Sequence, residues 1–405
     1  MFTNKSVWQI IKACGLSRQK AFIICHTLLF VSLGCSHFQE KNGNKQGAFV
    51  KVSKAFSSAG NKVSKWGVKS YGAAYNKVCI YTKAAFDVGS GSTKMKVAKV
   101  DVCKNKILKV FLNIHTQVSY KANLVPLGSN FILNKKIRRK GFFVLRQFVN
   151  RAKKFKPTKF VGVGTAAFRD AVNAKFFFKR IKKELNIDLK IISQEKEAQL
   201  GFFSAQTILS KLKPSLVQNK KIIVWDIGGG SMQIISKEKR KAFNFFLKKW
   251  LLYKGNLASS SFKNHIIKKI QKNIYKKSPN PISSAVVKKA VRYAFQQAKK
   301  TIPKSLQIAF KEKSLVLGIG GVHYFSILGQ VKKIFKNKKS NYYTQYEVQK
   351  TLQSRKHLSD KKIKGKHAST DISNLALVLG FMKYLDINTV YTNKVNLTDG
   401  ILLNL

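Results

Sequence analysis

The chain has 405 residues, enough for one to three domains, and 44% of them are apolar, which excludes a wholly disordered polypeptide. Its 78 Lys and Arg residues against 16 Asp and Glu give a formal net charge of +62, spread along the whole chain. This charge indicates either a lysine-biased proteome with a solvated basic surface, or a polyanionic partner such as nucleic acid, an anionic membrane or a phosphate polymer.

All five cysteines lie within the first 103 residues. They form no CxxC pair and no cluster with histidine at zinc spacing, so a structural zinc site is not expected. A disulfide scaffold is not expected either, because the rest of the chain contains no cysteine.

Residues 1–34 resemble a secretory signal peptide. Basic residues precede a short apolar run, 21–34, which is too short to span a membrane. The run ends in Leu-Gly-Cys, which resembles the lipobox of bacterial lipoproteins, with Cys35 as the lipid-modified residue. We therefore expect a cell-envelope protein, periplasmic or anchored at Cys35. The alternative is a cytoplasmic protein whose N-terminus forms an amphipathic or buried helix.

Residues 35–83 predict a basic linker, rich in Lys, Gly, Ser and Ala and without a sustained period. From residue 84 the pattern is that of an α/β domain. The predicted elements, in chain order, are strands at 84–88, 94–101 and 106–113, a helix at 135–154, a strand at 159–163, a helix at 173–185, a strand at 189–192 and a helix at 196–212.

One pattern occurs twice. Asp87 ends an apolar run and is followed by Val-Gly-Ser-Gly-Ser, and Asp226 ends a second run and is followed by Ile-Gly-Gly-Gly-Ser. Each copy predicts a strand, a tight turn and a returning strand. Glycine leaves backbone N–H groups open to a phosphate, and an aspartate at the strand end can hold a divalent cation. Two such hairpins facing each other would form a metal–phosphate cleft between two similar domains.

The second half is predicted to repeat the strand, glycine-turn and helix arrangement of the first half. It adds a mostly helical insertion at about 256–311. The other predicted elements are a strand at 221–225, a strand at 314–317 followed by Gly-Ile-Gly-Gly and a helix, a helix at 371–385, a strand at 389–391 and a final turn at 398–400.

Taken in order, these motifs resemble the exopolyphosphatase/guanosine pentaphosphate phosphatase family, a branch of the actin-like ATPase–sugar kinase superfamily. The matching segments are 87–92 for D-[LIV]-G-S-N-S, 164–171 for G-T-x-A-x-R-[DQ]-A, 192–198 for I-S-G-x-E-E-A, 226–231 for D-I-G-G-G-S and 318–321 for G-T-G-G. The resemblance covers about 84–405. It implies an α/β fold of two ribonuclease-H-like domains, 84–212 and 213–405, with a cleft between them.

The resemblance also implies roles for individual residues. Glu197 would orient or deprotonate a water, and Asp87 and Asp226 would hold Mg²⁺. The phosphate-binding residues would be Gly89, Ser90, Ser92, Thr93, Arg169, Gly228, Gly229, Gly230 and Ser231. The charged residues have simpler alternative roles. Glu197 would be an acid favoured in the first turn of a helix, and the two aspartates would stabilise their own turns. Arg169 would form a salt bridge with Asp170 or another acid.

The sequence departs from the family pattern at several of these motifs. Lys196 replaces the first of two glutamates, and Met232 and Gln233 stand where the family has Thr and Glu. Gly91 replaces Asn, and Val322 replaces the Thr that closes the third glycine motif. The glutamate at position 233 would help to hold Mg²⁺, so its replacement predicts weaker metal binding.

The implied function is a phosphoanhydride hydrolase that releases terminal phosphate from inorganic polyphosphate or a guanosine pentaphosphate-like nucleotide. The alternative is a catalytically weakened polyanion-binding protein on the same fold, and a kinase of the same superfamily is a third candidate. Contact with an anionic membrane and a homodimer are both compatible with this interpretation, whereas specific binding of nucleic acid is not expected.

Overall fold

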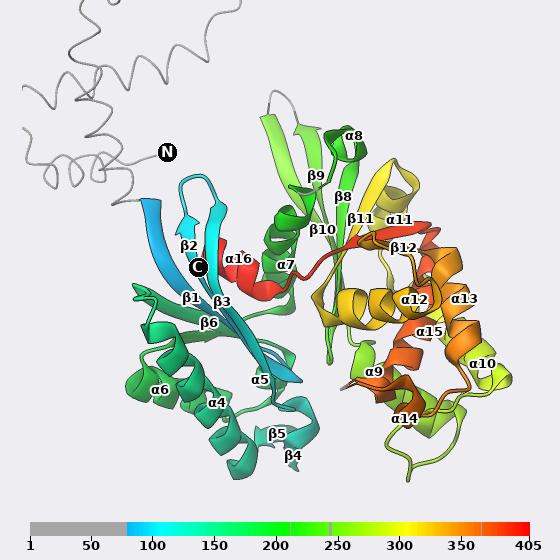
Figure 1. Cartoon of the computed structure of the whole chain (residues 1–405), viewed down its shortest axis with the longest axis horizontal. Helices are drawn as coiled ribbons and strands as arrows, with labels where there is room; N and C mark the ends of the chain where they lie inside the picture. The colour runs from blue at the N-terminus through cyan, green and yellow to red at the C-terminus, as the bar shows by residue number, and fades with distance from the viewer. Residues whose placement is uncertain (1–78, 211, 243–244, 366) are drawn as a thin grey trace, which may run out of the picture. The chain divides into compact units, whose positions relative to one another are not determined.

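Two β-sheets organise the computed structural model, which describes residues 79–405 apart from 211, 243–244 and 366 (Figure 1). The predicted signal peptide, 1–34, and nearly all of the predicted linker, 35–83, therefore lie outside the described residues. Within the described part, none of the helices combines the length and the apolar character that crossing a bilayer requires.

The first sheet has five strands in the order β3-β2-β1-β6-β7, with β1, β6 and β7 parallel and β2 and β3 paired as an antiparallel hairpin. Alternate side chains of β1 enter different cores, as a period of two requires. Phe86 packs beneath helices α4 and α6, while Ala85 packs on the opposite face beside Leu200 of α7. The bounds are β1 (Ile80–Val88), β2 (Ser92–Asp101), β3 (Lys106–Gln117), β6 (Lys159–Gly164), β7 (Asp188–Ile191), α4 (Lys135–Lys153), α6 (Ala174–Leu185) and α7 (Gln194–Leu209).

Shorter elements fill the connections around this sheet. A two-stranded hairpin of β4 and β5 follows β3, and helix α5 follows β6 and contains Arg169. Their bounds are a 3-10 turn η1 (Lys121–Asn123), β4 (Leu124–Leu127), β5 (Asn130–Leu133), α5 (Ala166–Asp170) and α8 (Pro214–Val217).

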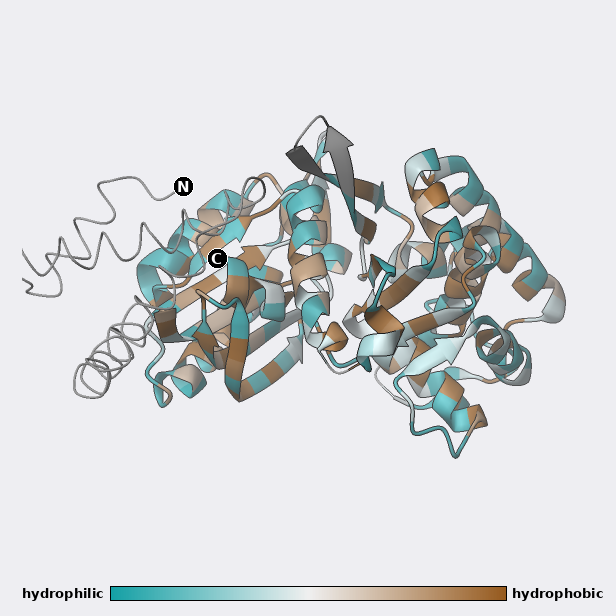
Figure 2. Ribbon diagram, turned by 90° about the horizontal axis from the view of Figure 1, so that it is seen from above, coloured by the Kyte–Doolittle hydropathy of each residue, from teal (hydrophilic) through white to brown (hydrophobic). Residues whose placement is uncertain are grey.

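The second sheet has six strands in the order β10-β9-β8-β11-β13-β12, with β8, β11 and β13 parallel at its centre. Hydrophobic residues line the central strands, and the surrounding helices present many hydrophilic residues (Figure 2). Helices α10 and α15 bury the larger core on one face, where α15 is buried on nearly every side. The strands are β8 (Lys221–Ile227), β9 (Met232–Ala242), β10 (Phe245–Gly255), β11 (Ser314–Ile319), β12 (Tyr342–Thr344) and β13 (Thr389–Thr392).

The helices of this second half include two short π-helical segments. The bounds are α9 (Ser259–His265), η2 (Ile266–Ile270), α10 (Ser284–Thr301), α11 (Lys304–Lys311), η3 (Val322–Leu328), α12 (Gly329–Ile334), α13 (Gln345–Arg355), α14 (Asp360–Ile363), α15 (Ala368–Leu385) and α16 (Leu397–Asn404).

Helix α7 belongs to the cores of both sheets. Leu200 packs with the first sheet, whereas Ala205 and Ile208 pack with the second. The C-terminal helix α16 then returns to the first sheet and packs on α7 and β2. Because the predicted base Glu197 stands in the first turn of α7, this double packing fixes the position of Glu197 from two sides.

Buried polar contacts tie α16 in place. Lys96 of β2 donates to Asp399 at 2.5 Å, and both side chains are almost fully buried. The Gly400 N–H donates to Ser204 Oγ of α7 at 2.8 Å, and Lys83 Nζ donates to the carbonyl oxygen of Leu402 at 3.3 Å. Four elements, β1, β2, α7 and α16, thus share one hydrogen-bonded junction.

The structure contains several elements that were not predicted from the sequence. The hairpin of β4 and β5, the strands β10 and β12 and the helix α13 were not anticipated, and the predicted turn at 398–400 lies inside α16. The basic, apolar-rich segment of β10 alternates poorly, which explains why its period does not indicate a strand. The insertion at 256–311 is helical at both ends but irregular between η2 and α10.

Cys79 and Cys103 are disulfide-bonded, although the cysteine spacing did not suggest a disulfide scaffold. The other three cysteines precede residue 79 and lie outside the described residues.

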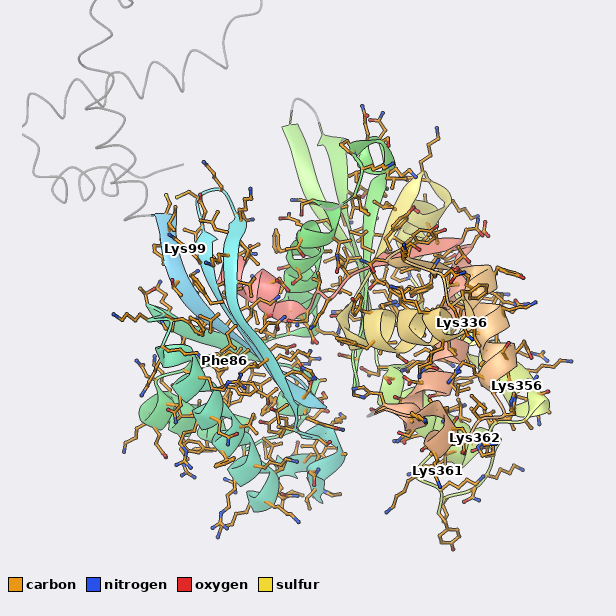
Figure 3. All side chains as sticks on the ribbon, in the orientation of Figure 1. Phe86, Lys99, Lys336, Lys356, Lys361 and Lys362 are labelled. Atoms are coloured by element: carbon orange, nitrogen blue, oxygen red, sulfur yellow. The ribbon has the colours of Figure 1, made fainter. Side chains whose placement is uncertain are left out.

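We expect Lys96→Met to lower the free energy of unfolding by about 3 to 5 kcal/mol, because it leaves the buried Asp399 carboxylate without its partner. The matched control is Lys99→Met, an exposed lysine on the same strand (Figure 3), which should change stability by less than about 0.5 kcal/mol. Urea unfolding measures both. Equal effects of the two substitutions would show that the buried pair does not hold α16.

Candidate active site

The two predicted glycine turns have the same closed geometry. In the first, the Gly89 N–H donates to the carbonyl oxygen of Ser92 at 2.9 Å, and in the second the Gly228 N–H donates to that of Ser231 at 2.9 Å. Each turn joins the end of a strand to an antiparallel neighbour, β1 to β2 and β8 to β9. The sequence repeat therefore corresponds to a structural repeat.

The turns lie against each other. A Cβ atom added to Gly230 would be 3.1 Å from Ser90 Oγ and 3.5 Å from Ala166 Cβ, so a larger residue at Gly230 would crowd the opposite turn. Ser90 Oγ in turn accepts a hydrogen bond from the Ala167 N–H at 3.2 Å. Glycine at position 230 leaves room for the side chains of Ser90 and Ala166, so the two turns can approach closely there.

Three carboxylates converge on these turns, and two of them have a basic partner. Asp87 accepts from Lys94 Nζ at 2.7 Å, and Glu197 accepts from the Arg169 guanidinium at 2.7 Å. Arg169 is also fixed by the carbonyl oxygen of Ile192, at 3.1 Å. Asp226 has no hydrogen-bonding or ion-pair partner in the described part of the chain, although its neighbours on β8 are buried.

Burial and like charge raise the pKa of Asp226 to about 7, with Glu197 and Asp87 as the repelling charges and Lys94 as the opposing attraction. Burial also raises the pKa of Glu197, although the Arg169 guanidinium acts in the opposite direction. The pKa of each of these two carboxyl groups therefore lies nearer to neutral pH than that of an ordinary carboxyl side chain. Shifted pKa values of this kind are common in catalytic sites.

Lys94 is the basic group common to all three carboxylates. Burial acts to lower its pKa, but the contact with Asp87 and the charges of Asp226 and Glu197 outweigh burial, so the pKa is raised. The ammonium group therefore stays charged and supplies positive charge at the site. Sequence reasoning missed this residue, since one lysine among so many carries no distinguishing signal.

The third glycine motif packs on Asp226. Gly320 has φ +85°, a left-handed conformation that favours glycine, and a Cβ there would lie 2.7 Å from Asp226 Oδ1. This position explains why a glycine follows β11, which is the parallel neighbour of β8.

The start of helix α9 completes the second turn and was also missed. The N–H groups of Ser259 and Ser260 donate to the carbonyl oxygens of Gly228 and Gly229 at 3.1 and 3.0 Å. The run of three serines at 259–261 after β10 was the available signal, because serine is favoured where a helix begins.

The remaining predicted phosphate ligands are not equally placed. Ser92 is half-buried at the end of the first turn, whereas Thr93 is fully buried, with its hydroxyl 3.4 Å from the Tyr120 hydroxyl. Arg169 pairs with Glu197 rather than with its neighbour Asp170, which binds Lys121 instead.

Met232 and Gln233, which differ from the family pattern after the second turn, are both buried in the protein. Met232 belongs to the core of the second sheet. Gln233 is 1% exposed, and its amide nitrogen donates to Ser231 Oγ at 3.0 Å. The predicted phosphate ligand Ser231 is therefore held by the residue that replaces the family glutamate.

The donor set is compatible with a divalent cation that takes most of its ligands from water and substrate. The residues of the described part do not form a group of three or more His, Cys, Asp or Glu side chains that could enclose a metal. Mg²⁺ commonly takes only one or two protein carboxylates, however, and completes its shell with water and substrate phosphates. Asp226, without a partner, fits that role, while Asp87 is engaged by Lys94.

The model of the Ppx/GppA phosphatase family matches residues 97–405. The chain belongs to this family. The crystal structure of the Aquifex aeolicus family member aligns with a TM-score of 0.59 at 17% identity, covering 80% of this chain and 97% of that one. The crystal structure of an exopolyphosphatase from Cytophaga hutchinsonii aligns with a TM-score of 0.58 at 15% identity, covering 79% of this chain and 96% of that one. These likenesses confirm the predicted fold of two actin-like ATPase domains.

Curated relatives of the Ppx/GppA chain match only in part. The guanosine-5'-triphosphate,3'-diphosphate pyrophosphatase of Aeromonas hydrophila is 29% identical over 159 residues, which cover 39% of this chain and 29% of the relative. The bifunctional 3-dehydroquinate synthase/phosphatase of Fusobacterium nucleatum is 24% identical over 159 residues, which cover 38% of this chain and 22% of the relative. The chain thus spans less than a third of the length of either relative.

We expect Asp226→Asn to stabilise the fold in metal-free buffer at high pH. The folded pKa of about 7 lies above the ordinary value of 3.8, so the wild type loses stability as pH rises from 3.8 to 7. The variant should be more stable by about 1 to 3 kcal/mol above pH 7 and no more stable below pH about 4.

Urea unfolding across this pH range measures the difference between the variant and the wild type. Asp386→Asn, at an exposed aspartate, is the control for the same chemical change at the surface. A pH-independent difference for Asp226→Asn would contradict a buried, repelled carboxyl group.

Proposed function

We propose that this Ppx/GppA protein hydrolyses phosphoanhydride bonds, releasing terminal phosphate from inorganic polyphosphate or a guanosine pentaphosphate-like nucleotide. The observation that best supports this is the convergence of Glu197, held by Arg169, and the unpartnered Asp226 beside two facing glycine turns. Phosphoryl transfer needs little covalent chemistry from the protein, so positioning and charge supply most of the catalysis.

In the proposed reaction, Glu197 orients a water molecule against the terminal phosphorus and accepts its proton. The bond from phosphorus to the bridging oxygen breaks, and the shortened chain leaves with the electron pair on that oxygen. Arg169 holds the Glu197 carboxylate in place through its 2.7 Å contact, which makes Arg169 a positioning residue as well as a candidate phosphate ligand.

The positive charge for the phosphate oxygens comes from this chain's Lys94, from Arg169 and from the N–H groups of the two turns. A bound Mg²⁺ ion, held through Asp226, would neutralise further charge on the phosphate oxygens. Asp87 keeps the Lys94 ammonium at the turn rather than in solvent. The net charge of +62 favours a long polyanion, because binding releases its counterions.

Glu197→Gln should reduce phosphate release from long-chain polyphosphate in the presence of Mg²⁺ by at least about a hundredfold, since the amide cannot accept the proton. The matched control is Glu195→Gln, an exposed acid in the same first turn of α7, which should change the rate by less than about twofold. A colorimetric phosphate assay measures both. No release by the wild type, or equal losses in the two variants, would sink the assignment.

A second candidate is a catalytically weakened polyanion-binding protein on the same fold. The observation that favours it is the buried Gln233, whose uncharged amide is committed to Ser231. The two candidates differ in whether bound polyphosphate is turned over.

Gln233→Glu should tighten Mg²⁺ binding by about tenfold, because it adds a carboxylate beside Asp226. Calorimetric titration with Mg²⁺ measures this, and Gln353→Glu on the surface of α13 is the control. Turnover that appears only in Gln233→Glu would support the weakened protein, whereas turnover already present in the wild type would support the hydrolase. Unchanged Mg²⁺ affinity would argue against a cation at Asp226.

We further propose that the protein resides in the cell envelope, periplasmic or anchored at Cys35. The disulfide-bonded state of Cys79 and Cys103 supports this, because disulfides persist in oxidising compartments and are rare in the cytosol.

Mass spectrometry of the protein from its native host should show a mature chain that begins at Cys35 and carries lipid. Alkylation without reductant should leave Cys79 and Cys103 unlabelled. A chain that retains its first residues and labels at both cysteines would place the protein in the cytoplasm.

A further inference from the structure

Helices α4 and α6 form the outer layer of the first domain, on the side away from α7 (Figure 1). They contact each other, and the Arg180 guanidinium of α6 lies 4.8 Å from the centre of the Phe142 ring of α4. We call their solvent side the α4/α6 face. It contributes neither a carboxylate nor a turn to the candidate active site.

The α4/α6 face is strongly basic. Helix α4 contains no acidic residue, and its exposed stripe includes Lys136, Arg139, Lys140 and Arg146 at helical spacing. Helix α6 contains one acid, Glu184, and that acid is paired with Arg180 at 2.6 Å. The α4/α6 face therefore presents positive charge with almost no acid to offset it.

Two phenylalanines stand out on this charged face. The exposed fraction is 49% for Phe143 and 77% for Phe176, whereas the other phenylalanines of α6 are buried. Phe143 lies within the stripe of cations on α4, and the Arg146 guanidinium lies 5.6 Å from its ring centre. Covering a large apolar ring removes its surface from water, which lowers the free energy.

We propose that the α4/α6 face docks onto an anionic lipid surface. Basic residues and phenylalanine on one side of a helix are the combination that lies in a membrane interface, with cations at the headgroup phosphates and rings at the acyl boundary. A free phosphate polymer would be held by the cations but would gain nothing from Phe143 and Phe176.

A single-stranded nucleic acid is the nearest rival, because bases stack on aromatic rings. The guanidinium of Arg146 lies over the Phe143 ring, 5.6 Å from its centre, and competes there with a stacked base. On a lipid surface both groups keep their places, since the arginine reaches the headgroups while the ring enters the boundary.

The test measures partition of the full chain onto vesicles of phosphatidylglycerol and phosphatidylcholine by sedimentation at physiological salt. Every sample carries Cys35→Ser, so that no lipid attaches at that position. The face variant combines Lys136→Gln, Arg139→Gln, Lys140→Gln and Arg146→Gln. The control combines Lys336→Gln, Lys339→Gln, Lys361→Gln and Lys362→Gln, which remove the same charge from exposed positions of the second domain (Figure 3).

The face variant should bind these vesicles at least about tenfold more weakly than the parent, whereas the control should bind within about twofold of it. Equal losses in both would show that bulk charge, not the α4/α6 face, drives binding, and would overturn the proposal. Thermal melts establish that both variants fold.

Phe143→Ser with Phe176→Ser keeps the charge and changes only exposed rings, so it should fold like the parent. It should weaken vesicle binding by about threefold or more and leave binding of inorganic polyphosphate unchanged. Unchanged vesicle binding would overturn the membrane assignment. Loss of binding to single-stranded DNA, with vesicle binding retained, would assign the face to nucleic acid instead.

Discussion

The ammonium group of Lys94, 2.7 Å from Asp87, lies within the electrostatic field of Asp87, Asp226 and Glu197 together. Three carboxylates in one partly buried space repel one another, and burial makes each charge more costly. Burial, together with the repulsion from Glu197 and Asp87, raises the pKa of Asp226, while Lys94 acts in the opposite direction. A site of this kind attracts a further cation or a phosphate that brings one.

The packing of α7 and α16 keeps these charges together. Glu197 stands in the first turn of a helix whose sides belong to both cores, so its position depends on both sheets. Helix α16 braces α7 through Gly400 and braces β2 through the buried pair of Lys96 and Asp399. Lys94 lies two residues before Lys96 on the same strand, so the brace also fixes the residue that neutralises the site.

Features that glycine and aspartate specify locally could be predicted from the sequence. The doubled turn at Asp87 and Asp226 follows from backbone geometry, and the ordered motifs were enough to recognise the family and its fold. The roles proposed for individual residues depend on the resemblance and stay predictions, although the structure brings Arg169 and Glu197 into contact.

Other features depend on contacts between distant residues and could not be predicted. Lys94 has a special environment only because three carboxylates from other elements approach it, and nothing in its local sequence distinguishes it. The same holds for the left-handed Gly320 against Asp226 and for the partner of Lys96 in α16. The second strand of the long β9–β10 hairpin was missed because its basic residues obscure the alternation that indicates a strand.

The central claim is that Lys94 and the carboxylates of both turns form one electrostatic unit. A double-mutant cycle of Lys94→Met and Asp226→Asn, followed by urea unfolding at pH 8 without divalent cations, tests it most directly. The account predicts that Lys94→Met costs about 1 kcal/mol less in the Asp226→Asn background than in the wild type, since the attraction between the two is then absent. Additivity within about 0.3 kcal/mol would contradict the account, because it would show that the two turns do not share their charge.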